Sequence, residues 1–169
     1  MAPRGLATRP TTDRVREALF AIIGDPVGLR VLDLYSGSGA LGLEALSRGA
    51  EHATFVERAR QAQLALRQNV EALGVGARVS LLGCTVERAL GPLARERFGL
   101  VLCDPPYAEL ARATRSLGQL RAAGIFADDV VVVLEHGTRD TPDDFGLGEP
   151  ARRTYGDTTL SIYERRSDR

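Results

Sequence analysis

The sequence predicts an α/β fold in which a mostly parallel β-sheet is covered by helices on both faces. Three observations lead to this prediction. Short apolar runs alternate with helix-forming segments along most of the chain, the order typical of parallel strand–helix–strand units. A glycine-rich turn follows the first of these runs. Near the carboxyl terminus the alternation gives way to a polar–apolar pattern that favours an antiparallel hairpin.

The first half of the chain supplies three of the expected strands. Residues 12–24 carry apolar side chains at the i, i+3, i+4, i+7 spacing of an amphipathic helix, preceded by Pro10 and Thr11 as a start signal. Strands are then expected at 31–34, 53–57 and 78–82, and helices at 40–48, 59–73 and near 86–97. Gly49 and Gly74 end two of these helices, and Pro92 is expected to interrupt the third.

The second half completes the sheet. Strands are expected at 100–103 and 130–135, with a helix at 109–123 between them, followed by a surface loop at 138–150. Residues 152–155 and 159–163 alternate polar and apolar side chains around Gly156 and Asp157, which predicts the closing hairpin. The chain is therefore interpreted as one domain of 169 residues without an internal linker.

Composition restricts the function classes. The formal net charge is zero, with 22 basic and 22 acidic residues, so the whole molecule is not a general binder of polyanions. Two cysteines, Cys84 and Cys103, are too few for a disulfide framework and lack zinc-ligand spacing. The apolar runs are too short to span a bilayer and no signal peptide is recognised, so a cytoplasmic protein that contacts no membrane is expected.

The glycine-rich turn predicts a nucleotide-like cofactor. The run 37–42 matches G-x-G-x-x-G, a weak sign of a dinucleotide site when it stands alone. Asp33, at the end of the strand before it, would repel a pyrophosphate but would favour an ammonium or sulfonium group, both of which S-adenosylmethionine carries. Glu57 ends the next strand, where an acid can bind two ribose hydroxyls. S-adenosylmethionine is therefore the favoured cofactor, and a nicotinamide or flavin nucleotide is the alternative.

The stretch Asp104-Pro105-Pro106-Tyr107 follows the fourth strand and predicts the reactive part of the site. Asp104 reaches the same sheet edge as Asp33 and Glu57, and the prolines make a stiff loop. Asp104 and the carbonyl of Pro105 can accept both N–H groups of an exocyclic amine, while Tyr107 offers a face for a base to stack on. The alternative is a plain Pro-Pro turn with a capping aspartate.

Other polar residues are given smaller roles. Thr85 is expected either to cap the following helix or to contact the cofactor. His52 and His136 are far apart and lack metal-ligand spacing, so they are interpreted as surface or supporting residues and no metal is expected. Ser36 and Ser38 do not form a G-x-S-x-G nucleophile elbow.

The chain resembles a known family through three stretches taken together. These are TRPTTDRVREALF at 8–20, LDLYSGSGALGLEALSR at 32–48, and Asp104 to Tyr107; the closing YGDTTLSIYERR at 155–166 extends the likeness. Together they resemble the RsmD-type bacterial 16S rRNA (guanine-N2)-methyltransferases. The resemblance implies a Rossmann-type class I methyltransferase fold with a seven-stranded sheet, using S-adenosyl-L-methionine to methylate one guanine N2.

The resemblance also implies roles for individual residues. Asp104, Pro105, Pro106 and Tyr107 would form the catalytic loop. Cofactor-binding positions would be Arg9, Thr11, Thr12, Asp33, Tyr35, Ser36, Gly37, Ser38, Gly39, Glu57, Arg58, Cys84, Thr85 and Asp104. A plain helix start explains Arg9, Thr11 and Thr12 equally well.

The implied partner is 16S rRNA or the assembling small ribosomal subunit, bound by a monomer. Family members usually begin with a short basic β-hairpin ahead of the RPTT run, and this chain is expected to lack it, with residues 1–11 as its remnant. Two alternatives stay open. One is an adenine-N6 methyltransferase acting on DNA or RNA, and the other is a non-catalytic RNA-binding module that kept the fold.

Overall fold

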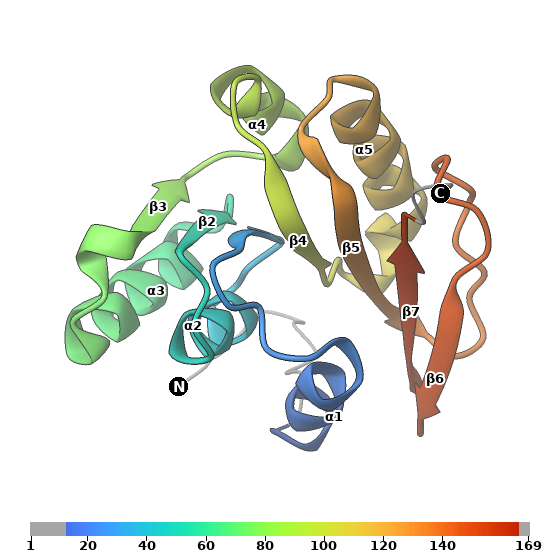
Figure 1. Ribbon diagram of the computed structural model, residues 1–169, viewed down its shortest axis with the longest axis horizontal. Helices are drawn as coiled ribbons and strands as arrows, with labels where there is room; N and C mark the ends of the chain where they lie inside the picture. The colour runs from blue at the N-terminus through green and yellow to red at the C-terminus, as the bar shows by residue number, and fades with distance from the viewer. Residues whose placement is uncertain (1–12, 166–169) are drawn as a thin grey trace.

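A computed structural model describes residues 13–165. Its centre is a seven-stranded sheet in the order β3-β2-β1-β4-β5-β7-β6 (Figure 1). The strands are β1 (Arg30–Leu34), β2 (His52–Val56), β3 (Val79–Leu82), β4 (Phe98–Cys103), β5 (Phe126–Gly137), β6 (Ala151–Tyr155) and β7 (Thr158–Glu164). Strands β1 to β5 pair in parallel, whereas β7 is antiparallel to both β5 and β6. The predicted sheet, mostly parallel with a final antiparallel hairpin, is confirmed.

Helices cover both faces of the sheet, as predicted (Figure 1). They are α1 (Asp13–Ile23), α2 (Ala40–Ser47), α3 (Arg60–Leu73), α4 (Val86–Leu93) and α5 (Leu110–Ala122), with 3-10 turns η1 (Gly76–Arg78) and η2 (Tyr107–Glu109). Buried side chains form one core under α1, α2 and α3 and a second under α4 and α5. Within β1, Val31 belongs to the first core and Leu32 to the second, because successive strand residues face opposite sides.

Several element boundaries differ from the sequence prediction, most of them by one or two residues. Strand β2 ends at Val56, so Glu57 lies one residue beyond it. Helix α4 ends at Leu93 instead of running towards residue 97, because Pro92 lacks the N–H that continues a helix. Strand β5 begins at Phe126, well before residue 130, and its polar start fits the sheet through a register shift against β4.

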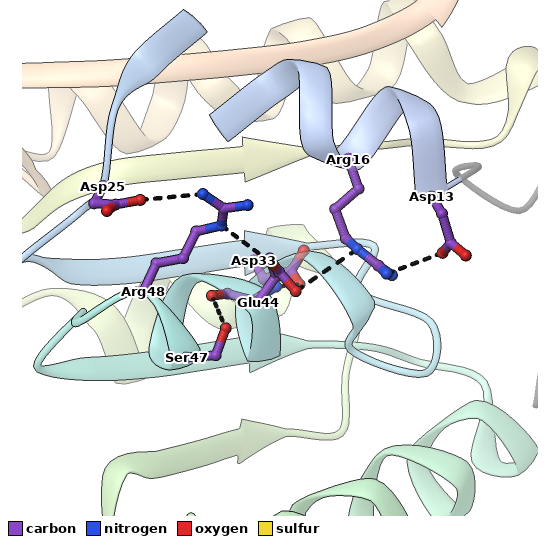
Figure 2. Close-up of polar contacts among 8 residues, drawn as sticks. Asp13, Arg16, Asp25, Asp33, Glu44, Ser47 and Arg48 are labelled. Carbon is purple, nitrogen blue, oxygen red and sulfur yellow. Dashed lines mark hydrogen bonds and ion pairs between the residues drawn. The ribbon is translucent and has the colours of Figure 1, made fainter. Parts of the chain in front are cut away.

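Helix α1 is attached to α2 by arginines on either side of Glu44 (Figure 2). Arg16 lies 3.8 Å from Glu44 and 2.9 Å from Asp13. Arg48 donates to Glu44 at 2.9 Å and to Asp25 at 3.1 Å. These ion pairs are partly exposed, so they orient the two helices more than they stabilise them. Buried Val15, Leu19 and Phe20 of α1 supply the apolar contact with the first core.

No helix within residues 13–165 combines the length and the apolar content that a membrane crossing requires.

Candidate functional site

The carboxyl ends of the parallel strands β1, β2 and β4 meet along one edge of the sheet. Leu34 of β1 is paired with both Val56 of β2 and Cys103 of β4. The next residues along each strand, Tyr35, Glu57 and Asp104, therefore leave the sheet side by side. The sheet order places β2 on one side of β1 and β4 on the other, so the connections diverge at this point. Open α/β sheets bind their ligands in the crevice at such a switch point.

Asp33 lies beneath this edge and is almost fully buried. Its Oδ2 accepts a hydrogen bond from the Gly42 backbone N–H at 2.9 Å, which ties the acid to the first turns of α2. Burial raises the pKa of Asp33 well above its ordinary value, and the charges of Asp104 and Glu57 raise it further, against the opposing effect of the Gly42 bond. The three acids that the sequence placed at strand ends thus lie within electrostatic reach of one another.

Glu57 holds the glycine turn and the start of α3 at once. Its Oε2 accepts a hydrogen bond from the Gly37 N–H at 2.8 Å, and its Oε1 accepts one from the Ala59 N–H at 2.9 Å. The Gln63 side chain donates to the Glu57 carbonyl at 2.9 Å. These bonds fix the carboxylate at the crevice in one orientation, which a ligand with two adjacent hydroxyl groups can use.

The glycine turn combines strained backbone with an unsatisfied hydroxyl. Tyr35 has φ 56°, the left-handed region that non-glycine residues rarely adopt, and within residues 13–165 it alone among non-glycine residues has a positive φ. The Ser36 Oγ is buried and makes no hydrogen bond to any described residue. A Cβ placed on Gly37 would have no atom within 4 Å, so the turn borders open space. A buried orphan hydroxyl beside open space indicates a polar ligand.

The other glycines of the turn serve packing. A Cβ on Gly39 would lie 2.2 Å from Leu66 Cδ1, and one on Gly42 would lie 2.4 Å from Phe55 Cε1. The G-x-G-x-x-G pattern therefore mixes two physical causes. Gly37 adopts φ 57°, a left-handed backbone that favours glycine, whereas Gly39 and Gly42 let α2 approach β2 and α3 closely. The Ser38 carbonyl accepts a hydrogen bond from Asn69 of α3 at 3.0 Å, which anchors the turn.

The loop after β3 supplies the third wall of the crevice. Thr85 is the N-cap of α4, and its hydroxyl accepts a hydrogen bond from the Arg88 N–H at 3.4 Å, so the capping interpretation is confirmed. Cys84 is half-buried, and burial raises the pKa of its thiol. A neutral thiol of this kind contributes shape and apolar contact more than charge.

An ion-pair chain crosses the rim of the crevice and was missed by the sequence analysis. Arg58, next to Glu57, donates to Glu109 Oε1 at 2.9 Å, and Arg112 lies 3.5 Å from the same oxygen. Arg112 also donates to Glu87 of α4 at 3.2 Å. The second oxygen, Glu109 Oε2, is buried without a partner among the described residues. Glu109 and Arg112 form a local i,i+3 pair, whereas Arg58 and Glu87 come from elements far from them in sequence, so no local pattern predicts the chain as a whole.

The Asp104-Pro105-Pro106-Tyr107 stretch follows β4 and leaves the sheet beside the glycine turn that follows β1. Pro105 is buried, whereas Tyr107 begins η2 and keeps 51% of its surface exposed. The Pro106 carbonyl accepts a hydrogen bond from the Glu109 N–H at 2.9 Å, which closes the turn. Burial raises the pKa of Cys103, and the charges of Asp104 and Asp33 raise it further. An exposed aromatic ring thus stands beside the acid cluster, where a flat substrate can stack.

The remaining predicted residues fall into two groups. Arg9, Thr11 and Thr12 lie outside the described residues. His136 is buried, with Nδ1 2.8 Å from the Gly137 carbonyl and Nε2 2.7 Å from Ser161 Oγ, so a surface position is wrong for it and it supports the end of β5. His52 lies 2.9 Å from Ser80 Oγ between β2 and β3. Within residues 13–165, no three His, Cys, Asp or Glu side chains gather in a way that could hold a metal ion.

Comparison with known proteins places the chain in a family. The profile of the family described as Conserved hypothetical protein 95 matches residues 1–164. The chain is 37% identical to YlbH of Bacillus subtilis, over 98% of this chain and 92% of that protein. It is 33% identical to Ribosomal RNA small subunit methyltransferase D of Escherichia coli K12, over 96% of this chain and 82% of the relative.

Solved structures show the same fold. A conserved hypothetical protein of Streptococcus pyogenes superimposes with a TM-score of 0.82 at 36% identity, covering 90% of this chain and 96% of that one. An RNA methyltransferase of Salinibacter ruber, solved in complex with S-adenosyl-L-homocysteine, superimposes with a TM-score of 0.69 over 92% of this chain and 93% of that one. The identity to the second protein is 16%, so it bears on the fold alone.

Proposed function

Because the chain belongs to the RsmD-type family of methyltransferases, we propose that it methylates the exocyclic N2 of a guanine in 16S rRNA, with S-adenosyl-L-methionine as methyl donor. The Escherichia coli relative, named as a small-subunit rRNA methyltransferase, supports an rRNA substrate. The observation that carries the proposal is the gathering of Asp33, Glu57 and Asp104 beside an open glycine turn and an exposed tyrosine. The choice of guanine N2 comes from the family resemblance of the sequence.

The crevice fits this cofactor in charge and in shape. Acids of one sign favour a ligand that carries ammonium and sulfonium groups, and Asp33 and Glu57 disfavour a pyrophosphate at the same place. The free Ser36 hydroxyl and the space at Gly37 suit the amino-acid arm, and Glu57 suits the ribose hydroxyls. Cys84 and Thr85 would border the adenine. When bound, S-adenosylmethionine supplies an electrophilic methyl group on a sulfonium.

The Asp104–Tyr107 loop would prepare the substrate amine. A guanine N2 is a poor nucleophile because its lone pair is delocalised into the ring. Asp104 and the Pro105 carbonyl accept its two N–H groups and favour a tetrahedral nitrogen, while the Tyr107 ring orients the base. The nitrogen would bond to the methyl carbon as the carbon–sulfur bond breaks, which would leave a neutral thioether, and the nitrogen would then lose one proton, through Asp104, to solvent. Alignment and exclusion of water supply most of the rate, as in other displacements.

The partner and the working state follow from the same proposal. The chain acts as a single-domain monomer in the cytoplasm on 16S rRNA or on the assembling small subunit. Because its net charge is zero, local arginines contact the phosphates, and the affinity for RNA falls as salt concentration rises. No metal ion takes part in the transfer step.

Transfer of a labelled methyl group tests the proposal. Small ribosomal subunits from a strain lacking this modification are incubated with tritiated S-adenosylmethionine and the chain, and the RNA is digested to nucleosides. Labelled N2-methylguanosine is expected. Labelled N6-methyladenosine would instead establish the adenine alternative, and cofactor binding without transfer to any RNA would establish a non-catalytic module.

A further inference from the structure

Gly137 is the last residue of β5, and its backbone conformation does not require a glycine. It is buried and pairs with Thr158 of β7. Its φ is not positive, unlike that of the glycines of residues 13–165 that adopt the left-handed region. Any residue can adopt this strand conformation, and a glycine inside a strand weakens it. The cause must lie in what approaches the α-carbon.

Two side chains occupy the space that a Cβ at position 137 would need. Such an atom would lie 2.9 Å from Cε1 and 3.2 Å from Cδ1 of Tyr107, and 2.6 Å from Oδ2 of Asp140. Asp140 is exposed and can rotate away at low cost. The Tyr107 ring is rigid and follows two prolines that restrict the backbone of its loop. The ring is therefore the neighbour that fixes residue 137 as glycine.

We infer that Gly137 is a positioning residue for the reaction: its missing side chain lets the Tyr107 ring lie against the end of β5. This inference rests on the proposed function, because it gives the tyrosine the task of holding the base. With one ring edge set against Gly137 and 51% of the residue exposed, the ring can be held in place and still be reached by a base. A side chain at 137 would push the ring out of line with Asp104, and small misplacements of a reacting group are costly in rate.

Substitution of Gly137 by alanine tests the inference. Gly137→Ala is expected to lower kcat for methyl transfer by about tenfold or more, while the Kd for S-adenosylmethionine changes by less than about twofold. Gly99→Ala is the matched control, since Gly99 is also a strand glycine without a positive φ. Its added Cβ would meet Leu29 Cδ2 at 3.0 Å, with Tyr107 not among its nearest atoms. Asp140→Ala is expected to leave the effect of Gly137→Ala unchanged.

A double-mutant cycle separates positioning from a general folding defect. In a Tyr107→Ala background, adding Gly137→Ala is expected to cause no further loss of rate, because the ring it would displace is gone. Equal losses in both backgrounds, or full activity of Gly137→Ala alone, would overturn the inference. If alanine at 137 prevents folding only when Tyr107 is present, the clash with the ring is demonstrated. If it prevents folding in both backgrounds, the glycine is purely structural and the inference fails.

A spectroscopic readout is independent of the methyl-transfer reaction. The chain contains no tryptophan, so Tyr107→Trp introduces a single indole at the position in question. Gly137→Ala is expected to shift its emission and to increase quenching by acrylamide, whereas Gly99→Ala leaves both unchanged. If Gly137→Ala changes neither the indole emission nor its quenching, Gly137 does not position the side chain at 107. If the wild-type chain transfers no methyl group to RNA but the indole responds, the proposed function fails and the packing of residue 107 on Gly137 stands.

Discussion

The two edges of the parallel sheet distribute their charges in opposite ways. At the amino edge, Arg30 of β1 is paired with Glu96, and Arg78 donates to the carbonyls of Leu46 and Ala50. At the carboxyl edge, by contrast, acids gather with acids, and their mutual repulsion contributes to the raised pKa of Asp33. The amino edge thus holds satisfied pairs, whereas the carboxyl edge holds the like charges of Asp33, Glu57 and Asp104 beside the ion pairs of Arg58 and Arg112 with Glu109.

This difference separates an edge that stabilises the fold from the edge that is proposed to bind the cofactor. Opposite charges and satisfied carbonyls add modestly to stability. Three features of the carboxyl edge cost stability: the like charges of the acids, the left-handed backbone of Tyr35 and the buried Ser36 hydroxyl without a partner. Such costs persist in proteins mainly where function requires them. The carboxyl edge is therefore the part of the molecule whose substitution should change activity more than stability, and the amino edge the reverse.

The largest effect is expected at Asp104. Asp104→Ala removes an acceptor for the substrate amine and should lower methyl transfer by about 10²–10⁴-fold, the usual range for a group that assists proton movement. S-adenosylmethionine should still bind with little change, because Asp33 and Glu57 remain. Single-turnover transfer and calorimetric titration measure the two quantities. A parallel loss of cofactor affinity would place Asp104 in binding instead.

Asp33 is the residue of the carboxyl edge whose substitution should change stability as well as activity. Its raised pKa means that the folded chain holds this proton more tightly than the unfolded chain. The stability of the wild type therefore falls as pH rises from the ordinary aspartate pKa through the raised one. Asp33→Asn removes this cost and can keep the bond from Gly42, so it should stabilise the free protein at neutral pH by on the order of 1 kcal/mol.

Thermal unfolding over a range of pH checks this result. The stability difference between Asp33→Asn and the wild type should grow with rising pH and vanish in acid, where both side chains are neutral. A difference of the same size at every pH would show that packing, and not the buried charge, governs the site.

A smaller effect is expected at Glu109. Glu109→Gln removes the charge shared by Arg58 and Arg112 and so loosens the link between the end of β2 and the turn that carries Tyr107. Because these arginines are about half exposed, the loss should be only a few fold in kcat/KM. It should shrink further in high salt, which screens the pair in the wild type. Steady-state kinetics at two salt concentrations measure this effect. A loss in kcat/KM of the same size at both concentrations would contradict an ion-pair role for Glu109.

The smallest effect is expected at the amino edge. Glu96→Gln weakens the ion pair with Arg30. The side chain of Arg30 is 39% exposed and that of Glu96 is 34% exposed. Denaturant unfolding should show a loss of about 0.2–1 kcal/mol, with methyl transfer unchanged. A drop in transfer as large as that of Glu109→Gln would show that the two edges are not separate in function.

Much of this arrangement could be predicted from the sequence because it depends on order along the chain. Parallel strands that alternate with helices must end at one edge, so residues that follow strands, such as Glu57 and Asp104, could be placed together. The capping role of Thr85 is likewise local.

What could not be predicted depends on contacts between distant segments. The bond from Gly42 to Asp33, the ion pair between Arg58 and Glu109 and the burial of His136 each depend on how one element is set against another. The packing of Tyr107 on Gly137 has the same origin. Motifs mark Asp33, Gly42 and Tyr107 as candidate site residues, but no spacing in the sequence identifies the partner that each of them contacts.

Calorimetric titration of S-adenosylmethionine into the wild type, Asp33→Asn and Glu96→Gln shows whether the carboxyl edge binds the cofactor. The two variants each change one carboxylate, at opposite edges of the sheet. The cofactor is expected to bind the wild type and Glu96→Gln equally, and Asp33→Asn is expected to weaken binding by about tenfold or more, equivalent to about 1.4 kcal/mol. Equal affinity for all three proteins, or no binding to the wild type, would contradict the assignment of the carboxyl edge to the cofactor.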